Sequence, residues 1–87
     1  MDITTVVDDV IQWMRKQREL DQLPAALIDA QTDVITEGIF DSMKLLQLIN
    51  YLEETYGITI SVEFMLPANL STPQGIAEMV VKLSTSC

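Results

Sequence analysis

Residues 37–46 read EGIFDSMKLL, in which Gly38 and two apolar residues precede Asp41, Ser42 and the start of a helical apolar pattern. The pattern runs to Tyr56, and the next residue is Gly57, which accepts the left-handed conformation that ends many helices. The stretch therefore predicts a helix over about 42–56. Asp41 or Ser42 is suited to cap its start, because their side-chain oxygens accept hydrogen bonds from unpaired backbone N–H groups.

The predicted helix has two sides, because successive residues are turned by about 100° around its axis. The side expected to face the core carries Leu45, Leu46, Leu48, Ile49, Leu52 and Tyr56. The opposite side carries Met43, Lys44, Gln47, Asn50, Tyr51 and Glu54. We expect these six side chains to be exposed, with Met43 as the one purely apolar member.

Three further helices are predicted around the same core. Apolar residues at helical spacing between Ile3 and Met14 indicate a helix over about 2–18, and its basic end (Arg15, Lys16, Arg18) suits the negative end of the helix dipole. Residues 61–66 predict a short helix that ends at Pro67. The last helix is expected over about 73–84, with Pro73 in the first helical position and either Thr72 as its cap or Ser71 with Gln74 as a capping box.

A long connection, residues 19–40, separates the first two predicted helices. It has no sustained period, although residues 24–28 are compatible with a helical turn. Long ordered connections in small domains pack through their own side chains or are functional. The apolar residues expected to anchor this one are Leu23, Leu27, Ile28, Val34, Ile35, Ile39 and Phe40.

Length and composition set the class of protein. Eighty-seven residues with 48% hydrophobic content predict one domain over 1–87. A net charge of −8 disfavours nucleic acid or an anionic membrane as a partner. The start carries no basic signal region, and no apolar run approaches the roughly 20 residues that span a bilayer. Cys87 is the one cysteine, so no internal disulfide forms. We expect a soluble, cytoplasmic monomer.

Ser42 has three possible roles on local grounds. It is a helix cap, a nucleophile, or the acceptor of a covalent group. Nucleophilic catalysis needs a base that takes the hydroxyl proton, and the chain contains no histidine. Lys44 lies about 200° around the helix from Ser42 and points elsewhere. A modified serine at a helix start remains open, because the positive end of the dipole and the unpaired N–H groups there favour a phosphate.

The stretch GIFDSM at 38–43, the leucine-rich helix after it and GITI at 57–60 together resemble the acyl and peptidyl carrier proteins. Their hallmark is a D-S-[LM] motif that opens the second helix. The resemblance covers nearly the whole chain. It implies an all-α, four-helix acyl-carrier-protein-like bundle with a long loop after the first helix and a short third helix.

The resemblance also implies how the protein acts. Ser42 receives a 4′-phosphopantetheine arm from coenzyme A, with Asp41 and Met43 as its motif neighbours, and the arm's thiol holds cargo as a thioester. The implied partners are a phosphopantetheinyl transferase, an adenylating ligase or acyltransferase that loads the cargo, and downstream synthase or tailoring enzymes. The carrier itself is not an enzyme. The face that the partners read consists of Met43, Lys44, Gln47, Asn50, Tyr51 and Glu54, although Asn50, Tyr51 and Glu54 equally suit plain solvated surface.

The kind of carrier is indicated by two departures from the fatty-acid members, which tend to place acids at the second and fifth positions after the serine. This chain has Lys44 and Gln47 there, and a lysine weakens docking to basic enzyme surfaces. The segment LPANLST at 66–72 is similar to that of stand-alone carriers of secondary metabolism. We therefore favour a discrete carrier of an amino acid or small acyl unit in polyketide or nonribosomal-peptide biosynthesis. The alternatives are a fatty-acid carrier and, in another class, an unmodified helical interaction module.

Overall fold

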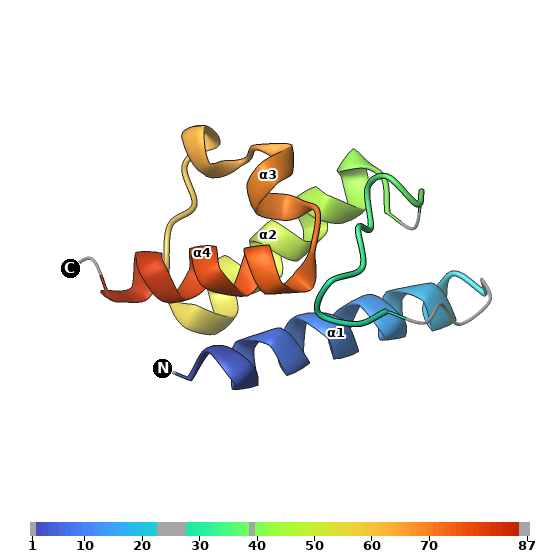
Figure 1. The fold of residues 1–87 in the computed structure, drawn as a ribbon, viewed down its shortest axis with the longest axis horizontal. Coiled ribbons are helices and arrows are strands. Elements are labelled where there is room, and N and C mark those ends of the chain that lie inside the picture. The colour runs from blue at the N-terminus through green and yellow to red at the C-terminus, as the bar shows by residue number, and fades with distance from the viewer. Residues whose placement is uncertain (1, 23–27, 39, 86–87) are drawn as a thin grey trace.

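The fold was analysed in a computed structural model that describes residues 2–22, 28–38 and 40–85. Over these residues the chain is helical and contains no strand. The long helices are α1 (Ile3–Leu20), α2 (Ser42–Tyr56) and α4 (Pro73–Thr85). A single 3-10 turn (Val62–Phe64) and the four-residue α3 (Pro67–Leu70) lie between α2 and α4 (Figure 1).

The predicted bounds agree for α2 and nearly agree for α1 and α4. Helix α1 starts at Ile3 because Asp2 is its cap, accepting a hydrogen bond from the backbone N–H of Thr4 at 3.1 Å. It continues to Leu20, two residues beyond the predicted end. Thr72 caps α4 as expected, because its hydroxyl oxygen accepts a hydrogen bond from the N–H of Gly75 at 3.0 Å.

The predicted helix over 61–66 is wrong. Only Val62–Phe64 form a turn, and Pro67, which was expected to end a helix, instead begins α3. Proline suits a first helical position, since its missing N–H has no partner inside the helix there. The Asn69 side chain then joins the two pieces by donating to the backbone carbonyl of Phe64 at 3.0 Å. The short helix expected at 61–66 is thus replaced by the later and shorter α3.

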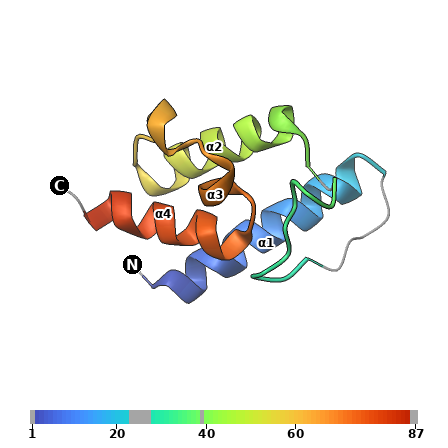
Figure 2. The same cartoon turned by 45° about the horizontal axis from the view of Figure 1, so that its top comes forward.

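The core lies where α1, α2 and α4 meet. Helices α1 and α4 run side by side, and α2 packs against both of them (Figures 1 and 2). Each contributes one apolar face, as the 3.6-residue period of the sequence predicts. The fully buried core side chains on these helices are Val6, Val10 and Met14 of α1, Leu48 and Leu52 of α2, and Ile76, Ala77 and Val80 of α4.

The described part of the long connection is tied to α1 and to the start of α4. Ile28, Val34 and Phe40 are buried as predicted, and Ile35 is half-buried. The backbone N–H of Val34 donates to the carbonyl of Ser71 at 2.7 Å. At the other end, the Arg15 guanidinium donates to the carbonyl of Ile28 at 3.0 Å. The predicted anchors Leu23, Leu27 and Ile39, the possible turn at 24–28 except for Ile28, and Cys87 lie outside the described residues.

Helix α2 differs from its predicted pattern at one apolar position. Leu45, Leu48, Ile49 and Leu52 are buried as expected, but Leu46 is 59% exposed. Its place in the core was therefore wrong. A helix of this length presents a limited arc to its neighbours, and Leu46 falls at the edge of that arc. Leu46 instead lines the surface beside Ser42.

Candidate functional site at the start of α2

The start of α2 is held by Asp41. Its backbone is extended, and its carboxylate accepts a hydrogen bond from the N–H of Lys44 at 3.0 Å. Its carbonyl accepts the first helical bond, from the N–H of Leu45 at 3.1 Å. Asp41 is therefore the cap, and Ser42 is the first residue of the helix. The structure decides between the two caps that the sequence allowed.

Ser42 is exposed and stands at the positive end of the helix dipole. Because Asp41 serves the N–H of Lys44, the N–H groups of Ser42 and Met43 have no partner within the described residues. A phosphate ester on the Ser42 oxygen would lie beside these donors. The residues present therefore fit a phosphate-linked group at this position.

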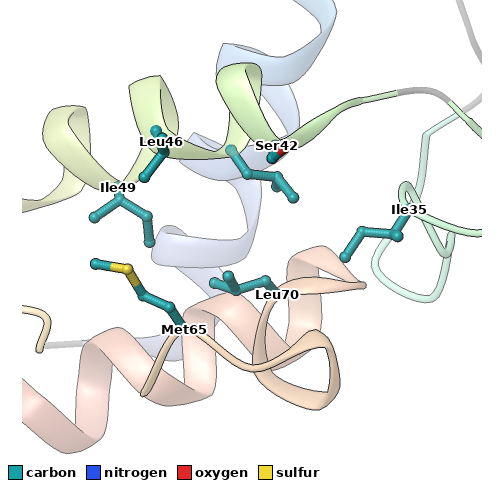
Figure 3. Close-up of a pocket in the computed structure, with 7 residues that line it drawn as sticks. Ile35, Ser42, Leu46, Ile49, Met65 and Leu70 are labelled. Atoms are coloured by element: carbon teal, nitrogen blue, oxygen red, sulfur yellow. The ribbon is translucent and has the colours of Figure 1, made fainter. Parts of the chain in front are cut away.

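An apolar cavity of about 250 Å³ opens directly beside Ser42. Figure 3 shows its walls, with Leu46 and Ile49 of α2 on one side, and Met65 and Leu70 on the other. Ile35, from the long connection, lies at the end near Ser42 (Figure 3). Leu45 completes the lining, and Ser42 is its one polar member among the described residues. Sequence reasoning missed this cavity, because its lining comes from three separate segments.

Lys44 does not extend outward as predicted. Its ammonium lies 2.8 Å from the Asp21 carboxylate and donates to the side-chain oxygen of Gln17 at 3.3 Å. The Lys44 side chain is only 23% exposed. Its charge is therefore directed to the end of α1, where it fastens the first turn of α2. No pattern within α2 alone signals this pairing.

Tyr51 was also placed wrongly, since it is half-buried against α1. Its ring stacks on Trp13 with the ring centres 5.9 Å apart, and its hydroxyl donates to the Asp9 carboxylate at 2.8 Å. The Tyr56 hydroxyl donates to the other oxygen of Asp9 at 2.6 Å. Burial, reinforced by the Asp9 hydrogen bond and charge, raises the pKa of both tyrosines. This cluster joins α1 to α2.

The other four residues of the predicted partner face are exposed. Met43 is 68% exposed, which confirms the sequence expectation for its position. Gln47, Asn50 and Glu54 are exposed as well. The structure thus keeps Met43, Gln47, Asn50 and Glu54 on the outer side of α2, while Lys44 and Tyr51 turn toward α1.

Acidic residues in the long connection have local backbone partners. The N–H of Gln31 donates to Asp29, and the N–H of Thr36 donates to Asp33, both at 2.8 Å. These bonds favour the ionised form, so the pKa of each carboxyl lies below its usual value. Across 2–22, 28–38 and 40–85, no group of three or more possible metal-ligating side chains comes together.

No helix in the described part of the chain is long and apolar enough to cross a membrane.

A search of curated proteins found no match to the chain. The family model described as a phosphopantetheine attachment site matches residues 17–80, which is most of the chain and includes the capped start of α2 with its exposed serine. The chain therefore belongs to the phosphopantetheine-attachment family, as a carrier protein whose cofactor is 4′-phosphopantetheine.

Proposed function

We propose that Ser42 is the residue to which 4′-phosphopantetheine is attached. The observation that carries this assignment is the position of its exposed hydroxyl, at a capped helix start and on the rim of an apolar cavity. Ser61, another exposed serine within the matched residues, instead donates a hydrogen bond to Glu63 at 3.3 Å and does not line this cavity.

The neighbours of Ser42 have separate roles in this proposal. Asp41 fixes the first turn of α2, and the N–H groups of Ser42 and Met43 are the donors left for the phosphate. Bound 4′-phosphopantetheine supplies a terminal thiol that holds cargo as a thioester. The chain has no histidine to activate the serine, so a phosphopantetheinyl transferase provides the base and the chain acts as a carrier without catalysis of its own.

For the cargo, we propose a small acyl or aminoacyl unit in polyketide or nonribosomal-peptide type biosynthesis. The cavity beside Ser42 supports a small unit, because about 250 Å³ is less than the roughly 300–1,000 Å³ of pockets for drug-sized ligands. The resemblance of residues 66–72 to stand-alone carriers points the same way. A fatty-acid carrier is the alternative. Assaying which adenylating ligase or acyltransferase loads the thiol distinguishes them.

Intact-mass analysis tests the attachment site. After incubation with coenzyme A and a promiscuous phosphopantetheinyl transferase, the wild-type chain should gain the mass of one phosphopantetheine unit. Ser42→Ala should gain none, because the acceptor oxygen is gone. Ser61→Ala is the matched control and should be modified like the wild type. An unmodified wild-type chain, or a modified Ser42→Ala, contradicts the assignment and favours an unmodified interaction module or another site.

A further inference from the structure

We infer that Lys44 is a positioning residue for the modification of Ser42, and that it acts through Asp21 at the end of α1 rather than through contact with a partner enzyme. This inference rests on the proposed function, since it takes Ser42 as the residue that is modified. The start of α2 and the end of α1 lie at the same end of the molecule (Figures 1 and 2). A contact between them can therefore hold the turn that carries Ser42.

The turn that carries Ser42 has few apolar anchors of its own. Phe40 is buried directly before it, and Leu45 is buried directly after it. Of the four residues between these two anchors, residues 41–43 are exposed, and Lys44 is half-buried. The position of the turn relative to the rest of the domain therefore depends on polar contacts.

Lys44 supplies such contacts in two directions. Its backbone N–H donates to the carboxylate of Asp41, the cap of α2, at 3.0 Å. Its ammonium pairs with the Asp21 carboxylate at 2.8 Å and donates to the side-chain oxygen of Gln17 at 3.3 Å. Lys44 thus connects the cap of α2 to the last turn of α1, and Ser42 lies between the cap and Lys44.

The end of α1 is a favourable place for this ammonium. Asp21 caps the helix there, and its N–H donates to the backbone carbonyl of Gln17 at 3.0 Å. The last carbonyls of a helix carry a partial negative charge, which adds to that of the Asp21 carboxylate. Because the Lys44 side chain is only 23% exposed, water screens this ion pair less than a fully exposed one. We therefore expect its effect to lie in the upper part of the range for ion pairs near a surface.

The first test is a double-variant cycle on the kcat/KM of Ser42 modification, measured with coenzyme A, a promiscuous phosphopantetheinyl transferase and intact-mass detection. Well below the Tm of every variant, Lys44→Met and Asp21→Ala should each lower kcat/KM by about three- to fivefold. The double variant should lose no more than either single one, because both changes remove the same contact. Lys44→Arg keeps the ion pair and should stay within about twofold of the wild type.

The cycle separates positioning from direct recognition of the Lys44 charge. If the transferase contacted that charge, Asp21→Ala would release the ammonium and leave kcat/KM unchanged or raise it. Such a result would overturn the inference, as would losses that multiply in the double variant. Lys16→Met and Glu19→Ala are the matched controls, because both residues are exposed near the same end of α1. They should be modified at the wild-type rate.

The second test needs no transferase. The N–H of Leu45 donates to the carbonyl of Asp41 at 3.1 Å, so its hydrogen exchange, followed by NMR, reports on the opening of the first turn. In Asp21→Ala this exchange should be about three- to fivefold faster, whereas the amide of Ile49, in the middle of α2, should keep its rate. Unchanged exchange of Leu45 would overturn the positioning role of Lys44. A wild-type chain that is never modified would overturn the proposed attachment site, so the two failures are distinguishable.

Discussion

The Asp9 carboxylate joins α1 to α2 through two hydrogen bonds. Its removal should therefore destabilise the protein more than the substitution of an ordinary half-buried residue. It accepts hydrogen bonds from Tyr51 at 2.8 Å and from Tyr56 at 2.6 Å. A hydrogen bond to a charged group contributes about 1.5–3 kcal/mol, so two give an upper bound of about 3–6 kcal/mol. All three residues are half-buried, and water replaces part of what is lost. Taking about half of that bound, we expect Asp9→Ala to lower the free energy of unfolding by about 1.5–3 kcal/mol.

Urea titration followed by circular dichroism at neutral pH measures this loss. The matching fall in Tm is roughly 6–24 °C, from about 4–8 °C per kcal/mol for a domain of this size. Asp9→Asn should lose less, because the amide oxygen still accepts from one tyrosine. Asp8→Ala is the control, since Asp8 is the neighbouring exposed acid of α1. If Asp9→Ala stays within about 0.5 kcal/mol of Asp8→Ala, the range typical of surface substitutions, the reasoning is refuted.

Two other predictions concern stability. The raised pKa values of Tyr51 and Tyr56 mean that the unfolded chain releases these protons first, so the contribution of the two tyrosines to the free energy of unfolding should be constant below about pH 10 and fall above it. Urea midpoints between pH 8 and 11 test this, and the double variant with Tyr51→Phe and Tyr56→Phe should show a smaller alkaline loss; an equal loss would assign it to other groups. Gly57 ends α2 with φ at 65°, so Gly57→Ala should cost about 1–2 kcal/mol in the same titration. Gly57→Asn should cost less, because asparagine tolerates this conformation, and equal costs would contradict the backbone explanation.

Helix α2 shows how much of the site can be predicted from local sequence. Its bounds, Ser42–Tyr56, follow from the acid–serine pair at its start and the glycine after its end. The residues of such a cap lie within four positions of one another, so the cap can be predicted from the sequence alone. The exposure of Met43 follows from the same helical period.

The region between α2 and α4 shows where local sequence is insufficient. A proline can either end a helix or occupy the first position of one, and the sequence around Pro67 is compatible with both. In the structure Pro67 begins α3. The hydrogen bond from Asn69 to the Phe64 carbonyl and the packing of α3 on α4 are formed in this arrangement. Neither contact has a signature in the 61–66 segment itself.

An acidic, all-helical domain with an exposed serine at a capped helix start can be predicted from the sequence alone, because composition, period and caps are local properties. The surroundings of that serine depend on the packing of segments that are distant in the sequence. Lys44 pairs with Asp21, Tyr51 donates a hydrogen bond to Asp9, and Leu46 is exposed at the cavity beside Ser42. A helical period predicts which residues share a face of α2. The neighbouring helix and its charged side chains determine which of these residues are covered and which stay exposed.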